Sequence, residues 1–557
     1  MNLQSLFRRK KLSDIETENS KNFQLHKVLG VRDLTFLGVA AIVGAGIFST
    51  IGRAAYEGGP AVSLLFILVA TACIFTALCY AQFASMIPIS GSAYTYTYIS
   101  LGEIFAWVIG WALLLEYAVS NMVVAIAWSE YFTTMLSGFG IHWPDWLGID
   151  YSSAKEAYNQ IQSGTFKNSI PDTVAKAAYT YSNAPQIGGI KILFDLPAGL
   201  ITLFITFIVY IGIKESKNLG NWLVILKLGV IILVIIAGSF FIKPENWSPF
   251  LPNGLGGVMG GVAAVFFAFI GFDSISTTAE EAKNPQRDLP KAMIFCLIIC
   301  ALLYVILSLV LTGMVNYKEL RVDDPLAYVF GKVGMDFIAG IISISAVISI
   351  TSTLLVYQIG QPRIWMSMSR DGLLGNKFSS INKKYKTPGF ATILTGILVG
   401  IPSMFLDMQF VVDLTSVGTF FAFILVCSGT LYLENKGETN KARFKIPYIN
   451  SQYITGICFI ICITLFITQT EYMKIIYEKP LLFIFALVWF GLSIASLKYK
   501  FSLIPILGIL FNLYLMTELG WSNWIMFIIW LLMGLIIYFI YGYNKSKLNP
   551  KNQIKTH

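Results

Sequence analysis

Long apolar runs, separated by short polar segments, recur along the whole chain of 557 residues. A helix needs about 20 apolar residues to cross the roughly 30 Å hydrocarbon core of a bilayer. Runs of this length predict about fourteen spanning helices, near residues 33–52, 61–87, 103–136, 194–213, 221–242, 256–280, 290–315, 336–368, 390–407, 410–433, 452–470, 480–497, 501–518 and 522–543. The pattern therefore predicts an all-α polytopic membrane protein.

The composition agrees with this prediction. Apolar residues make up 56% of the chain and charged residues only 13%, whereas ordinary soluble domains carry about 25% charged residues. The net charge of +9 comes from basic residues dispersed among loops and tails, while a nucleic-acid-binding protein gathers them on one face. We therefore expect a lipid bilayer as partner and no nucleic acid.

The basic residues also predict how the chain is oriented. An even number of spans places both tails, residues 1–32 and 544–557, on one side of the membrane. Of the 40 Lys and Arg residues, 28 lie on the side of the tails, 11 on the opposite side and one, Lys227, within a span. The positive-inside rule then predicts cytoplasmic termini for a protein of the cell (inner) membrane.

One predicted loop, residues 137–193, is much longer than the others. It contains several prolines and glycines and is too hydrophilic to enter lipid, so we expect an extracytoplasmic insertion. Either it caps the protein on that side, or it is an insertion of the kind that surface loops accept at little cost. We favour the second interpretation.

The sequence contains no pattern typical of a metal site. All seven cysteines lie within apolar runs, without a paired spacing in a polar loop, and the three histidines, His26, His142 and His557, are elsewhere. A structural zinc site takes four such ligands. We therefore expect reduced, buried cysteines, no metal and no cofactor.

Two predicted spans are interrupted by glycine at similar positions. Gly44, Ala45 and Gly46 lie near the middle of the first run, and residues 269–274 (FIGFDS) interrupt the sixth. This spacing is typical of two inverted five-helix repeats whose unwound segments meet at the bilayer midplane. Freed N–H groups can hold a carboxylate and freed carbonyls an ammonium group, which together bind an α-amino acid. Alternatively, these glycines only allow close helix packing.

Four motifs carry a family resemblance. Residues 39–48 (VAAIVGAGIF) resemble the first-helix signature of the amino acid-polyamine-organocation superfamily. Residues 88–96 (PISGSAYTY) resemble the loop between helices 2 and 3, while residues 266–290 (FFAFIGFDSISTTAEEAKNPQRDLP) and 361–372 (QPRIWMSMSRDG) resemble helices 6 and 8 of the cationic amino acid transporter branch. The resemblance extends over about residues 30–435.

The resemblance implies the leucine-transporter-like fold, with a 5+5 inverted repeat over residues 33–435 and extra peripheral helices over residues 436–543. The long loop after helix 3 departs from the family's core. The resemblance also implies that the substrate carboxylate meets backbone N–H groups around Gly44, Ala45 and Gly46. It places the substrate ammonium group on the carbonyls of Ile42, Phe267, Ala268 and Ile270.

Lys227 interrupts the apolar run of the fifth predicted helix. An intramembrane lysine costs roughly 2.5–3.5 kcal/mol on insertion scales, which makes Lys227 a functional candidate. It also lies close enough to the helix end to snorkel to the interface. The resemblance favours a role in proton coupling, because in proton-coupled members a lysine amine takes the place of a sodium ion. In that role Lys227 would donate to first-helix carbonyls such as that of Ile42, and to helix 8.

Two acidic residues also lie within predicted spans. Glu116, near the middle of helix 3, either relays protons, faces a substrate amine or makes a structural hydrogen bond. Asp273 follows the break of helix 6. It either bonds the freed backbone as a structural or gating residue, which we favour, or contacts the substrate directly. A further charged group at the cytoplasmic ends of helices 6 and 8 either is solvated or latches an inner gate: Glu280, Glu281, Arg287, Arg363, Arg370 and Asp371.

Together these features predict a secondary active amino-acid transporter that works by alternating access and is driven by protons. A substrate exchanger without proton coupling is the alternative within transport. A membrane enzyme would need a clustered nucleophile, acid–base pair or metal set, which the sequence lacks. An amino-acid-sensing receptor would need an output domain, which the short tails do not provide. The side chain of the substrate, cationic or neutral, stays open.

Overall fold

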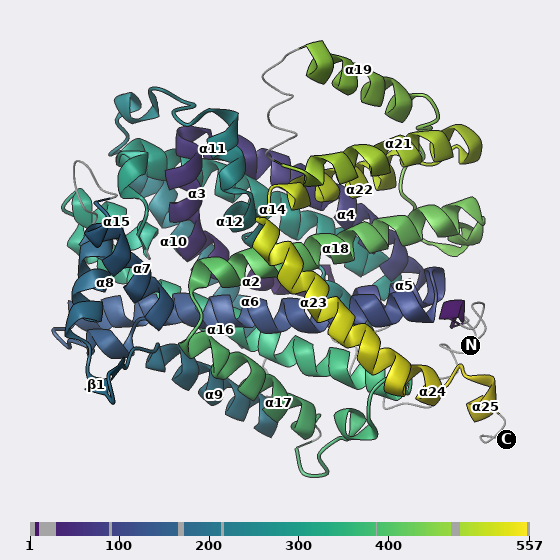
Figure 1. Cartoon of the computed structure of the whole chain (residues 1–557), viewed down its shortest axis with the longest axis horizontal. Helices are drawn as coiled ribbons and strands as arrows, with labels where there is room; N and C mark the ends of the chain where they lie inside the picture. The colour runs from purple at the N-terminus through teal and green to yellow at the C-terminus, as the bar shows by residue number, and fades with distance from the viewer. Residues whose placement is uncertain are drawn as a thin grey trace.

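The computed structural model describes residues 6–10, 29–87, 92–164, 172–212, 217–322, 324–385, 387–468 and 479–553. Within these residues the fold is a bundle of helices with one two-stranded hairpin (Figure 1). The long apolar helices are α4 (Val62–Met86), α6 (Glu103–Gly138), α10 (Lys217–Ser239), α14 (Pro285–Met314), α16 (Asp336–Arg370), α18 (Met408–Asn435), α21 (Leu481–Tyr499) and α23 (Trp521–Ile537). Shorter apolar helices are α9 (Leu196–Ile211), α17 (Gly389–Gly400), α19 (Ile454–Thr468) and α22 (Leu503–Thr517). Every one of the fourteen predicted runs contains helix, which confirms an all-α polytopic fold.

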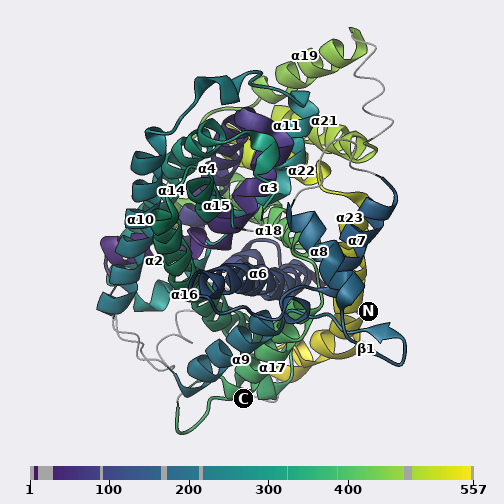
Figure 2. The same cartoon turned by 90° about the vertical axis from the view of Figure 1, so that its left-hand side faces the viewer.

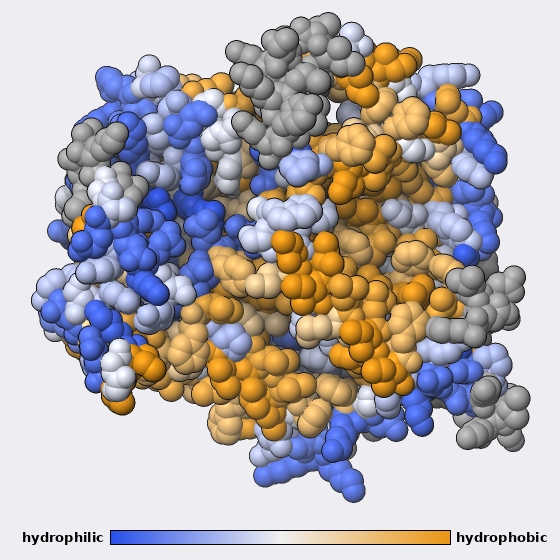
Figure 3. Space-filling view, viewed as in Figure 1, coloured by the Kyte–Doolittle hydropathy of each residue, from blue (hydrophilic) through white to orange (hydrophobic). Residues whose placement is uncertain are grey.

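Apolar side chains form a broad belt across the middle of the face shown in Figure 3. Phe204, Leu302 and Ile536 are 57%, 61% and 58% exposed, which a soluble protein would not tolerate over so wide a surface. Polar residues gather at the two ends, as expected where the chain leaves the hydrocarbon core. The belt identifies the surface that faces lipid.

The helices of the core form two packing groups. In one, α4 and α14 pack against each other and α14 also packs against α2 (Val31–Ile42). In the other, α6 packs against α16, and α9 packs against α17. Helix α10 contacts α2 and α14 of the first group and α16 of the second. A side chain on α10 can therefore bond both groups at once.

The first and sixth spans are broken, as predicted. After α2 the chain leaves the helix at residues 43 and 44 and continues as a π-helical turn, η2 (Gly46–Thr50), and α3 (Ile51–Gly58). The sixth span consists of α11 (Gly254–Gly260), α12 (Val262–Phe267) and α13 (Ser274–Thr277), with turns over residues 268–273. Segment α12 contacts both η2 and α3, so the two breaks lie together.

Two glycines at the breaks have no room for a side chain. A Cβ on Gly46 would lie 2.4 Å from the Cα of Ala268. Gly271 has a φ of +117°, a conformation that side chains disfavour, and its Cβ would lie 3.0 Å from the Cβ of Ala41. Close packing and unwinding, which the sequence offered as alternatives, are therefore both present.

The described residues between 139 and 195 form a small folded unit at one end of the bundle, here called the loop side (Figure 1). It contains α7 (Tyr151–Gln162), α8 (Asp172–Asn183) and the hairpin β1 (Gln186–Ile187) and β2 (Ile190–Lys191). Ala154, Ala184 and Leu193 make a core of its own. The sequence predicted a hydrophilic insertion here, and the structure adds that it folds.

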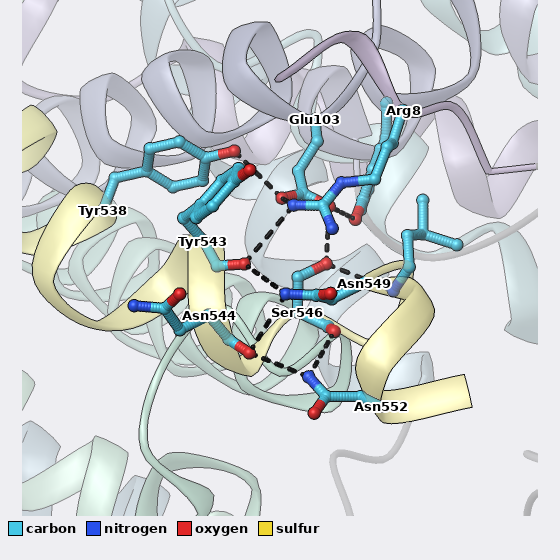
Figure 4. A network of polar contacts seen from close by, with 10 residues as sticks. Arg8, Glu103, Tyr538, Tyr543, Asn544, Ser546, Asn549 and Asn552 are labelled. Carbon is cyan, nitrogen blue, oxygen red and sulfur yellow. Dashed lines mark hydrogen bonds and ion pairs between the residues drawn. The ribbon is translucent and has the colours of Figure 1, made fainter. Parts of the chain in front are cut away.

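The opposite end of the bundle, the terminal side, carries both ends of the chain (Figure 1). Glu103, at the start of α6, is fully buried and accepts four side-chain hydrogen bonds (Figure 4). Arg8 and Tyr538 donate to Oε1, each at 2.9 Å, and Tyr98 and Ser546 donate to Oε2 at 2.9 and 2.5 Å. This carboxylate thus ties the N-terminal segment, α6 and the C-terminal segment together.

The prediction that all seven cysteines are buried was wrong for two of them. Cys458 is exposed and Cys462 half-buried, because α19 lies at the edge of the bundle (Figure 1) and presents most of its surface outward. The other five, Cys73, Cys79, Cys296, Cys300 and Cys427, are buried. None of the seven is in a disulfide.

Candidate functional site

A closed cavity lies between the two breaks. The space between its atoms amounts to about 180 Å³ but is too narrow to admit a water-sized sphere, and every residue that lines it is buried. The lining residues are Ala41, Ile42, Gly44, Ala45, Gly46, Val124, Phe267, Ile270, Thr353 and Tyr357. None of these described residues is charged. The cavity is therefore small, largely apolar and separated from solvent.

The first break leaves backbone donors at this cavity. The N–H of Val43 still donates to Val39 at 2.8 Å, as in a helix, and the carbonyl of Gly44 accepts from Ile47 at 3.2 Å. Between them, the N–H groups of Gly44 and Ala45 have no hydrogen-bond partner within the described chain. A buried N–H normally has a partner, so these two donors suit an anionic ligand group.

The predicted backbone acceptors are partly occupied. Tyr304 donates to the carbonyl of Ile42 at 3.2 Å, and Tyr357 donates to that of Ile270 at 3.4 Å. Each carbonyl oxygen has two lone pairs, so both retain room for a ligand ammonium group. Phe267 accepts from the N–H of Ile270 at 3.2 Å. Ala268 does not line the cavity and packs instead against Gly46.

Sequence reasoning missed the wall that the unbroken helices provide. Val124 of α6 and Thr353 and Tyr357 of α16 complete the cavity. All three are ordinary members of apolar helices, and the sequence contains no local signal that distinguishes them from their neighbours. Only the packing of α6 and α16 against the breaks identifies them.

Lys227 is fully buried on α10, and its ammonium group is bonded within the protein. The Nζ atom donates to the carbonyls of Ala40 and Val43 at 3.0 and 2.9 Å and to the hydroxyl of Thr353 at 3.1 Å. The acceptors are carbonyls at the first broken helix and a hydroxyl group of α16, the two places expected from the sequence. The carbonyl of Ile42, given there as an example, is not among them and accepts from Tyr304 instead.

The two predicted carboxylates are also buried. One oxygen of Glu116, Oε2, has no hydrogen-bond partner within the described chain, and its carboxyl group interacts with the hydroxyl of Thr419. The carboxylate of Asp273 interacts with its own backbone N–H and that of Ser274, at the start of α13. The hydroxyl groups of Tyr80 and Tyr117, which are close enough to feel both carboxylates, have no hydrogen-bond partner in the described part of the chain.

On the terminal side, charged pairs join segments that are distant in sequence. Arg363 of α16 lies 3.3 Å from Glu281, just after α13. Asp371, at the end of α16, accepts from Lys10 at 2.8 Å and from Tyr94 at 2.7 Å. Of the remaining residues in the predicted cluster, Arg287 and Arg370 are exposed. The side chain of Glu280 lies outside the described residues, as do residues 88–91 of the predicted motif.

The loop side is closed by contacts from the second half of the first broken helix. Ser49 donates to Glu130 of α6 at 3.0 Å, and Tyr131 donates to the carbonyl of Phe48 at 2.6 Å. One turn further out, Arg53 lies 3.7 Å from Asp413 of α18. The cavity is therefore covered on both sides.

Comparison with known proteins supports this geometry. A family model described as amino acid permease matches residues 29–492, and a second, described as the C-terminus of these permeases, matches residues 502–546. The chain belongs to the amino acid permease family. The superfamily resemblance of the motifs is thereby confirmed. Membership identifies the chain as an integral membrane transporter rather than a membrane enzyme.

Several relatives of this permease align over nearly their whole length. The branched-chain amino acid permease of Bacillus subtilis (strain 168) is 38% identical over 98% of this chain and 99% of its own. The methylthioribose transporter of the same organism is 36% identical over 98% of this chain and 100% of its own. The vacuolar cationic amino acid transporter 4 of Arabidopsis thaliana is 30% identical over 100% of this chain and 98% of its own.

Proposed function

We propose that this permease is a proton-coupled symporter that carries one α-amino acid with a small, neutral, apolar side chain. The observation that carries the proposal is the closed cavity, which combines unpaired backbone donors with an uncharged lining. The ten-helix region 33–435 is the transport core in this proposal. Residues 436–543 are peripheral, and the termini lie in the cytoplasm of a protein of the cell membrane.

The backbone groups at the breaks account for recognition of the α-amino acid. The N–H groups of Gly44, Ala45 and Gly46 would hold the substrate carboxylate, and the carbonyls of Ile42, Phe267 and Ile270 would hold the ammonium group. Ala268 was predicted as a further contact for the ammonium group, but it does not line the cavity. Because backbone groups make these contacts, they select both charged ends of the substrate and leave its side chain to the cavity wall.

The cavity wall favours a small apolar substrate. The space between the lining side chains does not admit a water-sized sphere in this conformation, so a small substrate would require the least displacement of the wall. A cationic side chain would lose its hydration there without a lining carboxylate to replace it. The branched-chain relative, at 38% identity, agrees with this choice, whereas the cationic amino acid relatives are about 30% identical.

Lys227 supports proton coupling. Its three acceptors belong to α2 with the first break and to α16, so the ammonium group links the two packing groups beside the cavity. A deprotonated amine is a poorer donor and would weaken that link. Protonation can then bias the conformational cycle by the difference in stabilisation that it gives the two states. Glu116, with its unpaired oxygen, is the second proton-carrying candidate, and Asp273 is a structural or gating one.

Competition uptake into proteoliposomes tests the substrate class. Unlabelled leucine, valine, alanine, arginine and lysine would each compete with labelled leucine, alongside leucinamide, N-acetyl-leucine and methylthioribose. We expect competition by the small apolar amino acids alone. Competition by arginine at the affinity of leucine would contradict the neutral substrate, and competition by both blocked derivatives would contradict the backbone site.

Lys227→Met tests the coupling, because it keeps the apolar stem and removes the titrating group. Labelled substrate uptake would be measured with and without an inward proton gradient, and substrate binding in detergent. We expect the variant to bind substrate but no longer to accumulate it in response to the gradient. Gradient-driven accumulation at the level of the unmodified protein would refute coupling through Lys227. If uptake by the unmodified protein does not respond to the proton gradient and requires substrate inside the vesicle to exchange with, the permease is an exchanger.

A further inference from the structure

The hairpin on the loop side carries two large apolar side chains that the described chain leaves uncovered. Ile187 and Ile190 are each 72% exposed. They are direct cross-strand partners in the antiparallel pair, and side chains directly opposite each other on antiparallel strands lie on the same face. The two isoleucines therefore form one apolar patch beside the turn.

The hairpin holds this patch in a defined position. Gly188 and Gly189 have φ angles of +60° and +82°, as in the type I′ turn that requires positive φ at both central residues. A Cβ on either glycine would meet no described atom within 4 Å, so the turn projects freely. At its base, the N–H of Ile192 donates to Pro185 at 2.8 Å, and Lys191 lies 4.2 Å from the ring centre of Tyr181.

The hairpin lies at the margin of the lipid-facing belt. It projects past the edge of the helix bundle when the loop side is viewed directly (Figure 2). Four residues, 192–195, connect the hairpin to α9, whose Leu200, Leu203 and Phe204 are 51%, 53% and 57% exposed. The isoleucine patch is thus held close in the chain to a helix that presents apolar side chains outward.

We propose that the hairpin tip inserts Ile187 and Ile190 into the headgroup region of the leaflet on the loop side. Apolar faces of interfacial elements typically enter a bilayer by about 5–10 Å, to the boundary between headgroups and acyl chains. Two isoleucines alone would bind a membrane weakly. Here the spanning helices already hold the hairpin at the membrane, so its local concentration there is high and weak binding is enough for insertion.

Site-directed spin labelling of the full chain in liposomes tests this proposal. Cys458 and Cys462 would be replaced by serine, since the other five cysteines are buried. Ile187→Cys and, separately, Ile190→Cys would carry the nitroxide, and Glu156→Cys on the exposed face of α7 is the matched control. Collision rates would be measured with oxygen, which partitions into lipid, and with a water-soluble nickel chelate.

We expect labels at 187 and 190 to collide several-fold less with the nickel chelate than the label at 156, and more with oxygen. Nickel collisions as frequent as at 156 would place the hairpin in water and overturn the proposal. Low collision rates with both reagents would also overturn it, because the tip would then be covered by protein, such as a second copy of the chain. If one of the two cysteine variants does not fold, the label at the other position still tests the proposal.

Discussion

The ammonium nitrogen of Lys227 lies 3.1 Å from the hydroxyl oxygen of Thr353, and that hydroxyl lies 3.1 Å from the carbonyl of Ala40. Three helices, α10, α16 and α2, therefore meet at one polar point inside an apolar bundle. Thr353 also lines the closed cavity. The arrangement connects the substrate site to the candidate proton site through a single side chain.

Thr353→Val should impair coupled uptake. The variant keeps the shape of the side chain but removes one of the three acceptors of Lys227, and an unsatisfied buried polar group costs about 1–3 kcal/mol. We expect gradient-driven uptake in proteoliposomes to fall by about fivefold or more. Thr353→Ser, which keeps the hydroxyl, is the control and should stay near the original rate. Equal rates for the two variants would contradict a polar role for Thr353.

Gly44→Ala and Gly46→Ala should fail in different ways. A Cβ at Gly44 would lie 2.7 and 2.8 Å from the hydroxyl oxygen and the methyl carbon of Thr353, so this side chain would have to shift away from its bond with Lys227. A Cβ at Gly46 would meet the backbone of Ala268 at 2.4 Å, which only a helix shift can relieve. We expect Gly44→Ala to fold but lose coupled uptake, and Gly46→Ala to melt at a lower temperature in detergent.

Thermal melting and uptake of both variants check this prediction. A Gly46→Ala variant with the original melting temperature and weakened substrate binding would show that the ligand, rather than helix packing, needs the space at that position.

The breaks and Lys227 could be found in the sequence because glycines and a lysine are conspicuous within apolar runs. The acceptors of Lys227 could not be found in this way. The choice of Ala40 and Val43 over Ile42 depends on how α2 is rotated against α10 and on the hydrogen bond from Tyr304 of α14. Val124 and Tyr357 were missed because a cavity wall of ordinary helix residues is defined only by packing. The folded unit at 139–195 was missed because its core is only three residues.

The stability of this loop-side unit should depend on pH through Asp150. Asp150 caps α7 by accepting from the N–H of Ser153 at 2.9 Å, and burial raises the pKa of its carboxyl group. The folded state therefore favours the protonated form, so stability falls as pH rises from about 3.9, the unfolded value, through the raised pKa. The slope cannot exceed about 1.4 kcal/mol per pH unit for one group.

Asp150→Asn removes the charge and keeps an N-cap side chain, while Asp150→Ala removes both. At pH 7 we expect the Asn variant to protect the amides of α7 from hydrogen exchange at least as well as the unmodified protein. The Ala variant should lose about 1 kcal/mol of protection, as expected for a lost cap. Comparing variants at the same pH cancels the intrinsic exchange rates. An Asn variant less protected than the unmodified protein at pH 7 would contradict the effect of burial.

Glu103→Gln should destabilise the terminal side of the permease. The carboxylate accepts hydrogen bonds from Arg8, Tyr98, Tyr538 and Ser546, and it is fully buried. An amide keeps one acceptor oxygen, and its nitrogen can bond Tyr98 and Ser546 only if both hydroxyl groups change from donor to acceptor. The guanidinium of Arg8 also loses its charged partner.

Breaking a buried ion pair by removing one partner costs about 3–5 kcal/mol, and we expect a loss of that order for Glu103→Gln. Tyr538→Phe, which removes a single neutral donor, should cost only about 1 kcal/mol. Thermal unfolding in detergent measures both, and limited proteolysis reports whether the C-terminal segment is released. Because the bonds of Glu103 reach both ends of the chain, Glu103→Gln should also expose the C-terminal segment to protease well below the melting temperature. If Glu103→Gln has the same melting temperature as Tyr538→Phe and resists protease, the tails are held by other contacts, such as the pair of Lys10 and Asp371.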